Sequence, residues 1–302
     1  MKKFSRILVG LDHSPDGKRL SIGSQCALEE AAALAREHGA ELVLLHSTFG
    51  EEYLDPLTAH AAIVSLGDTP DGAAALEAAC EQQRAAGLKA TLERSEERPL
   101  AAFSARVKGG ADLVVVGKRS EDDDDGRRLG SVAIQLLRYC HAPVLVVPPR
   151  PGVDPGPVLA ATDLSEVGVR ATRAGAELAR VRGVPLHVVH AYQIPFELIH
   201  AAAREPREEH QAKLGRIKSD AEAAIRKGLG GAAAELHVGC TTPSRAIEAA
   251  IELVRPSVLV MGTVSRGGIP GLLFGNTAER ILPRVDCAIL AVKPDDFVSP
   301  ID

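Results

Sequence analysis

The chain alternates short apolar runs with longer segments in which small and apolar residues recur at helical spacing. A run such as 113–116 has no polar face, which is typical of a strand buried on both sides of a parallel sheet. The segments between the runs are rich in Ala and Leu, and several end at glycine, a common helix stop. We predict strands at 6–11, 41–46, 89–93, 113–116, 143–147, 158–162, 186–190, 235–238, 258–261 and 288–292, and helices at 21–37, 73–86, 100–108, 131–139, 169–182, 208–227, 244–254 and 277–282.

This order of elements occurs twice along the chain. In each half the fourth apolar run ends at a glycine, followed by two residues, a serine, nine residues and a second glycine. A strand that ends at glycine and enters a helix through a polar loop aims backbone N–H groups at an anion. The pattern predicts two copies of one ligand-binding fold, residues 1–150 and 151–302, joined by a proline-rich linker at 148–157. The loop residues are Gly117, Ser120, Gly130 and Ser131, and then Gly262, Ser265, Gly275, Asn276 and Thr277.

Composition supports a globular chain and argues against several functional classes. The chain has 302 residues, 45% hydrophobic and 25% charged, which suits about two domains. A net charge of -5 and scarce aromatic residues argue against a nucleic-acid partner. The five cysteines show neither metal-ligand spacing nor a disulfide framework, so we expect reduced thiols and no metal site. The sequence contains no apolar stretch long enough to span a membrane and no signal peptide, so we expect a soluble, cytoplasmic protein.

Strands that alternate with helices form parallel sheets with right-handed crossovers, and ligands bind beyond the carboxyl ends of such strands. If the first and fourth strands of each half are neighbours, Asp12 and Gly117 flank one crevice and Asp163 and Gly262 the other. Two roles stay open for each aspartate, a helix N-cap or a ligand contact. We expect Ser14 or Asp16 to cap the first helix.

The histidines near the strand ends favour structural roles. His46 and His190 end the second strand of each half, and we interpret them as polar residues at strand ends. His187 and His190 are an odd number of residues apart on one strand. They therefore face opposite sides of the sheet and cannot share a metal ion.

The strand-end aspartate and the spaced loop resemble the universal stress protein family, which carries an aspartate after strand one and a glycine-rich loop after strand four. The resemblance extends in tandem over nearly the whole chain, and the stretch from Gly262 to Asp295 looks most like the E-type tandem members. It implies two doubly wound α/β domains with five parallel strands each, in the order 3-2-1-4-5, the universal stress protein or adenine nucleotide hydrolase-like fold. It also implies pairing of the fifth strands, within the chain as a pseudo-dimer or in a homodimer. Some members bind ATP, with the aspartate near the nucleotide and the loop on its phosphates and ribose, and others bind none.

The two halves differ in what their loops offer a nucleotide. Both place serine where the ATP-binding pattern has its second glycine, which removes conformational freedom but adds a hydroxyl. Residues 121–125 are all acidic and repel a triphosphate unless a cation intervenes, whereas the second loop carries Arg266 and no acid. The second half is therefore the better host. Its expected contacts are Asp163, Gly262, Ser265, Arg266, Gly275, Asn276 and Thr277; the weaker set is Asp12, Gly117, Ser120, Gly130 and Ser131.

The motifs of common enzyme classes are missing from the sequence: no P-loop, no GxGxxG, no nucleophile elbow and no HExxH occurs. We therefore expect a non-catalytic, tandem stress-response module whose second half binds an adenine nucleotide, ATP with Mg²⁺. Two alternatives stay open. One is a scaffold or sensor of the same family that binds another small ligand, a lipid or a protein; residues 193–199 would line its pocket, although their pattern favours the start of a core-packed helix. The other, weaker alternative is a slow ATPase.

Overall fold

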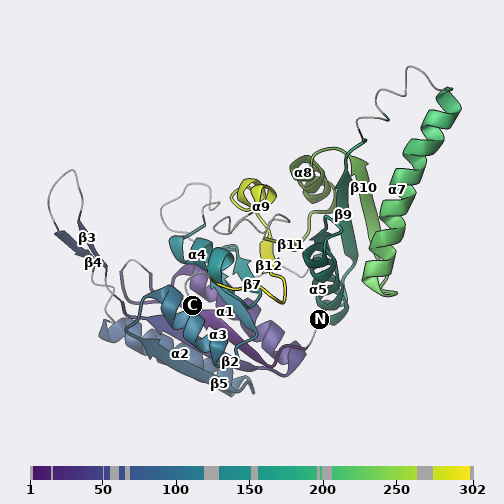
Figure 1. The fold of residues 1–302 in the computed structure, drawn as a ribbon. Helices are drawn as coiled ribbons and strands as arrows, with labels where there is room; N and C mark the ends of the chain where they lie inside the picture. The colour runs from purple at the N-terminus through teal and green to yellow at the C-terminus, as the bar shows by residue number, and fades with distance from the viewer. Residues whose placement is uncertain are drawn as a thin grey trace. The chain divides into compact units, whose positions relative to one another are not determined.

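The computed structural model describes residues 3–14, 16–49, 51–54, 61–64, 69–118, 129–150, 156–195, 198, 206–263 and 275–299. The chain divides into two compact units (Figure 1). The first comprises Lys2–Val153 with Val298–Asp302, and the second comprises Asp154–Phe297. Each unit is built around five parallel strands.

The first unit has the strand order 3-2-1-4-5 that the family resemblance implies. Along the sheet the order is β5-β2-β1-β6-β7, and every neighbouring pair is parallel. Ile7 of the central strand lies opposite Leu42 on one side and Leu113 on the other. The strands are β1 (Arg6–Gly10), β2 (Glu41–Ser47), β5 (Ala90–Ser95), β6 (Leu113–Gly117) and β7 (Val144–Val147).

Among the residues that the structure describes, four helices pack on the first sheet. Helix α1 packs on β1 and β6, and α3 packs beside α4. A separate antiparallel pair, β3 (Glu51–Leu54) and β4 (Ala61–Val64), lies in a region for which the sequence pattern predicts no strand. The helices are α1 (Ile22–His38), α2 (Pro70–Ala85), α3 (Pro99–Lys108) and α4 (Ser131–Tyr139).

The second unit repeats this topology with the order β10-β9-β8-β11-β12, again all parallel. Helix α5 packs on β8 and β11 and beside α7, and α8 packs beside α9. The strands are β8 (Val158–Ala161), β9 (Leu186–Tyr192), β10 (Glu235–Cys240), β11 (Val258–Gly262) and β12 (Ala288–Val292). The helices are α5 (Glu166–Arg182), α7 (Arg207–Leu229), α8 (Pro243–Val254) and α9 (Asn276–Ile281).

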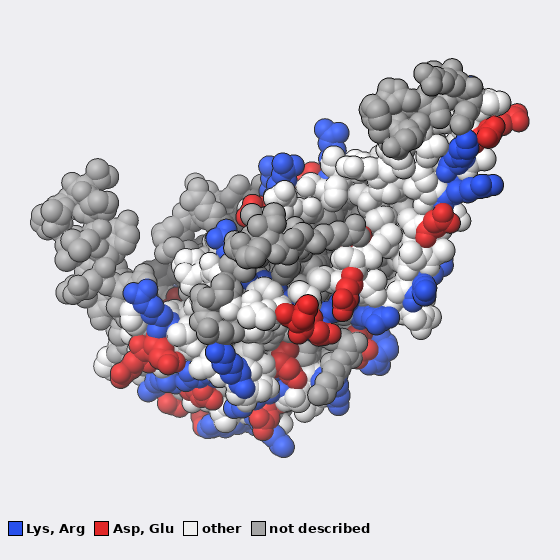
Figure 2. All heavy atoms as spheres, viewed as in Figure 1, with Lys and Arg blue, Asp and Glu red and all other residues white. Residues whose placement is uncertain are grey.

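The cores come from the apolar runs and from small residues on the helices. All five residues of β12 are buried, as are Val158 to Ala161 of β8. Helix α7 contributes little to the core, because it buries only Ala221, Ile225, Gly228 and Leu229 of its 23 residues. Acidic and basic side chains are interspersed along it (Figure 2), with Lys213 3.3 Å from Glu209 one turn away. Such a helix is stabilised by its own i,i+4 pairs and by packing along one narrow side.

Glycine ends three long helices, as their positions in the sequence predict. Gly39, Gly183 and Gly230 follow α1, α5 and α7, and each adopts the left-handed conformation that residues with a Cβ avoid. The predicted cap of the first helix is wrong. Ser21, not Ser14 or Asp16, is the N-cap of α1, and its hydroxyl accepts a hydrogen bond from the Ser24 N–H.

Candidate functional site

In the second unit a tight turn carries Asp163 beyond the carboxyl end of β8. The carboxylate Oδ1 of Asp163 accepts hydrogen bonds from the N–H of Ser165, at 3.0 Å, and from its hydroxyl. Ser165 is the N-cap of α5, where its Oγ accepts the N–H of Gly168. The N-cap role for Asp163 is therefore wrong: this exposed carboxylate supports the cap from one residue further away. Leu164 between them has a φ of 63°, an uncommon conformation for leucine.

Asp12 occupies the matching position in the first unit, with a longer loop behind it. Its carboxylate accepts the N–H of His13 at 2.8 Å, and its own N–H donates to the Ser24 hydroxyl of α1 at 2.7 Å. It does not cap α1, so this N-cap role is also wrong. The loop then folds back on itself before Ser21, with the N–H of Ser14 bonded to the carbonyl of Arg19.

In each unit one buried histidine forms a hydrogen bond with the carbonyl of the residue that precedes the aspartate. The Nδ1 of His46 on β2 lies 2.9 Å from the carbonyl oxygen of Leu11, and the Nδ1 of His190 on β9 lies 2.9 Å from that of Thr162. A carbonyl only accepts, so each Nδ1 carries a proton and donates it. The interpretation of these histidines as structural residues at strand ends agrees with these bonds, which the sequence did not reveal.

The strand-end glycines Gly117 and Gly262 have a packing role. A Cβ on Gly117 would overlap the backbone of Gly23 in the first turn of α1, and a Cβ on Gly262 would lie 2.6 Å from Cγ1 of Val167 in α5. Glycine at these positions lets the helix start approach the fourth strand closely. Neighbouring Lys118 is buried, with a relative exposure of 2%, which is unusual for lysine and has no signature in the sequence.

The second loop glycine of each half begins a helix. Gly275 is the N-cap of α9, and its N–H donates to the carbonyl of Thr263 at 2.9 Å. Gly130 is the N-cap of α4, which begins at Ser131. Neither glycine has a side chain to cap its helix, so first-turn N–H groups, including those of Asn276 and Thr277, lack a side-chain cap partner. Ser120, Ser265, Arg266 and the acidic run 121–125 lie outside the described residues.

These groups meet at the carboxyl edge of each sheet. The first and fourth strands are neighbours in both units, as the predicted crevices require. In the second unit Ala160 pairs with Val260, so Asp163 and Thr263 each follow the paired positions by three residues. The topology therefore brings Asp163, Gly262, Gly275 and the start of α9 to one region where the strand order reverses, which is where ligands bind in doubly wound sheets.

Comparison with known proteins agrees with this architecture. The model of the universal stress protein family matches residues 3–148 and again 156–293. Universal stress protein E of Escherichia coli K12 is 29% identical over 217 residues, 68% of each chain. A Pseudomonas aeruginosa PAO1 protein of unknown function has a similar structure, with a TM-score of 0.70 and 22% identity over 97% of this chain and 94% of its own.

A universal stress protein from Archaeoglobus fulgidus also has a similar structure, with a TM-score of 0.64 and 19% identity over 97% of this chain and 99% of its own. Among the described residues, no helix is both long and apolar enough to cross a membrane. The two family matches account for both halves of the repeat in the sequence. The chain therefore belongs to the universal stress protein family and carries two copies of its domain in tandem.

Proposed function

We propose that this tandem universal stress protein is a non-catalytic stress-response module that binds an adenine nucleotide in its second unit. One observation carries the proposal. The exposed carboxylate of Asp163 follows β8, and the N–H of Gly275 is held against Thr263 at the end of the adjacent strand β11. A hydrogen-bond acceptor and a helix start with uncapped N–H groups thus flank the switch point of the sheet.

The chemistry of these groups suits the two ends of a nucleotide. A carboxylate accepts hydrogen bonds from ribose hydroxyls or from the adenine amino group. The first-turn N–H groups of Asn276 and Thr277 donate to phosphate oxygens. When Mg²⁺ accompanies ATP, it neutralises part of the phosphate charge, and Arg266 in the intervening loop adds a positive charge.

The first unit is the poorer host for two reasons. The acidic run 121–125 follows β6 in the sequence, and its negative charge repels phosphate. Its connection from β1 to α1 is longer than that from β8 to α5 and folds as a small hairpin, with His13 bridged to Leu20.

Isothermal titration of the full chain with Mg-ATP tests the proposal, with matched variants in the two units. Asp163→Ala and Gly275→Val weaken binding, and Asp12→Ala and Gly130→Val leave it unchanged. Loss of a hydrogen bond to a charged group costs about 1.5–3 kcal/mol, so Asp163→Ala weakens binding by roughly 10- to 150-fold. No heat from the parent protein at high micromolar Mg-ATP, or a loss confined to the first-unit variants, contradicts the proposal.

Two further measurements separate the alternatives. Phosphate release above background from the parent protein, abolished in Asp163→Ala, would identify the slow ATPase. Native mass spectrometry of protein purified without added ligand would identify a scaffold or sensor if a lipid-sized mass were retained. Pairing of the two units through their fifth strands, and a homodimer, stay predictions of the family resemblance.

A further inference from the structure

Three side chains with metal-binding atoms meet on β9 and β10, away from the proposed nucleotide site. His187 is the second residue of β9, and Glu235 and His237 lie near the start of β10. The parallel register places Glu235 opposite His187, and residues 235 and 237 face the same side because strand side chains alternate. The cluster therefore lies toward the amino ends of the strands, whereas Asp163 and Gly262 follow or end strands at the carboxyl edge.

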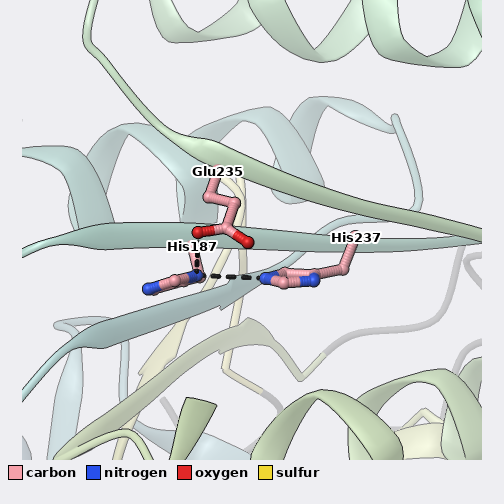
Figure 3. Close-up of side chains that lie close together, drawn as sticks. All are labelled: His187, Glu235 and His237. Atoms are coloured by element: carbon pink, nitrogen blue, oxygen red, sulfur yellow. Dashed lines mark hydrogen bonds and ion pairs between the residues drawn. The ribbon is translucent and has the colours of Figure 1, made fainter. Parts of the chain in front are cut away.

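The nitrogen and oxygen atoms of the cluster face one another. The Nδ1 of His187 lies 3.0 Å from the Nε2 of His237 and 3.6 Å from the Oε2 of Glu235 (Figure 3). One ligand atom from each residue can be chosen so that all three lie within 4.8 Å of one another. Zinc bonds of about 2.0–2.1 Å at tetrahedral angles separate ligand atoms by roughly 3.3 Å. The two separations from the Nδ1 of His187 already approach this spacing, so side-chain rotations would close the site.

The contact between the two rings also fits a bound metal ion. The two facing histidine nitrogens share one hydrogen bond, so one nitrogen donates and the other accepts. A divalent ion that replaces this hydrogen bond would bind both rings and the carboxylate together.

We propose that His187, Glu235 and His237 form a binding site for a divalent transition metal, with Zn²⁺ as its preferred ion. Two imidazoles and a carboxylate match zinc's ligand preferences, and three protein ligands leave a fourth position for water or another small ligand. Glu235 is exposed, so an ion has access from solvent. The ion joins neighbouring strands and clamps β10, the end strand of this unit's sheet order, onto β9. This site departs from the expectation of no metal.

The ligands come from separate parts of the chain, which explains why their spacing carries no motif. His187 and His237 are 50 residues apart, and α7 lies between them in the sequence. The inference does not depend on nucleotide binding, because the residues and the end of the sheet differ. His190 takes no part in this cluster. It lies an odd number of residues from His187 on β9, so the two side chains face opposite sides of the sheet. The Nδ1 of His190 bonds instead to the Thr162 carbonyl.

Titration of the full chain with ZnCl₂ in the presence of a non-thiol reductant tests the site. The starting protein carries Cys240→Ser, because this exposed thiol follows the cluster on β10 and would bind zinc itself. In that background, His187→Gln and His237→Ala each weaken zinc binding by at least about tenfold, since even loss of an outer-shell partner costs 10- to 100-fold. Glu235→Gln weakens it as well. His141→Gln, a partly exposed histidine of the first unit, is the matched control and leaves affinity unchanged.

Two readouts keep the outcome decisive. The melting temperature without metal shows that each variant folds, and zinc raises it for the starting protein and the control but not for the ligand variants. Co²⁺ in place of Zn²⁺ gives visible absorption bands in the starting protein that His237→Ala removes. The proposal is overturned if the starting protein shows no saturable zinc binding, if Co²⁺ gives no such bands, or if folded His237→Ala binds zinc as tightly as the control.

Discussion

Replacing Gly168 by alanine tests the close packing between α5 and the turn that carries Asp163. Gly168 is the third residue of α5, and a glycine-to-alanine change inside a helix ordinarily stabilises a protein by about 0.5–1 kcal/mol. Here, however, the new Cβ would lie 2.6 Å from Oδ1 of Asp163 and 2.6 Å from Oγ1 of Thr162. Carbon–oxygen contacts are ordinarily about 3.3–3.6 Å, so the helix start or the turn must shift by roughly 0.7–1 Å.

Overpacking and helix propensity have opposite effects on the stability of Gly168→Ala, and their relative size decides whether the variant is more or less stable. Overpacking of a close contact costs about 1–3 kcal/mol, against the gain of about 0.5–1 kcal/mol from helix propensity. We expect Gly168→Ala to destabilise the second unit by about 1–2 kcal/mol, which lowers its melting temperature by roughly 2–8 °C. The shift also displaces the Asp163 carboxylate, so any Mg-ATP affinity should fall as well.

Other helical glycines of the same unit provide a graded control series. A Cβ would lie 3.0 Å from the Ala160 Cβ at Gly175 and 3.4 Å from Val169 at Gly228, and it would meet nothing within 4 Å at Gly215. Alanine at Gly215 should stabilise the unit by about 1 kcal/mol, alanine at Gly228 by a similar amount, and alanine at Gly175 should be close to neutral.

Differential scanning calorimetry of the full chain measures the series, because a chain of two units need not unfold in one transition. All four substitutions report on the same unit, so the comparison is internal. If Gly168→Ala raises the melting temperature as much as Gly215→Ala does, the turn does not lie against the start of α5 as closely as the 2.6 Å separations indicate.

Two further predictions concern backbone strain and thiol exposure. Arg255, the C-cap of α8, is exposed and has a φ of 49°, so Arg255→Gly should raise the melting temperature by relieving about 1 kcal/mol of backbone strain. Gly183→Ala at the C-cap of α5 should lower the melting temperature by a similar amount. Shifts of the same sign in the two variants would contradict this. An aromatic disulfide reagent should modify the exposed thiol of Cys240 first in the native protein, and Cys240→Ser should remove this fast phase. The buried thiols of Cys26, Cys80 and Cys140 should react only after unfolding, because burial shields them from the reagent. Burial also raises the pKa of Cys26 and Cys80, which keeps these two thiols protonated.

Much of the fold follows from local pattern. The apolar runs at 113–116 and 258–261 correspond to β6 and β11, each extended by one residue to the glycine. The helix stops at Gly39 and Gly183 follow from glycine's access to positive φ. The ribbon of β3 and β4 escaped prediction because its segments are short and lack a clear alternation of apolar and polar residues.

The candidate site was less accessible to sequence reasoning. The spacing from Gly117 and Gly262 indicates where loops follow strands, but not that these glycines are packed against helix starts. Asp12 and Asp163 stand where an N-cap is plausible, yet Ser21 and Ser165 fill that role because they are adjacent to the first helical residue. Which of several polar residues caps a helix depends on the path of the loop.

By itself the sequence determined the tandem repeat, the alternation of strands and helices, and the glycines that end three long helices, because these depend on periodicity and on the conformational limits of single residues. Only the tertiary structure decided which distant side chains meet. His46 reaches the Leu11 carbonyl, and His187 reaches His237 across 50 residues, because parallel pairing aligns strands that lie far apart in the chain. Register between such strands is set by packing of the whole unit, and no local pattern records it.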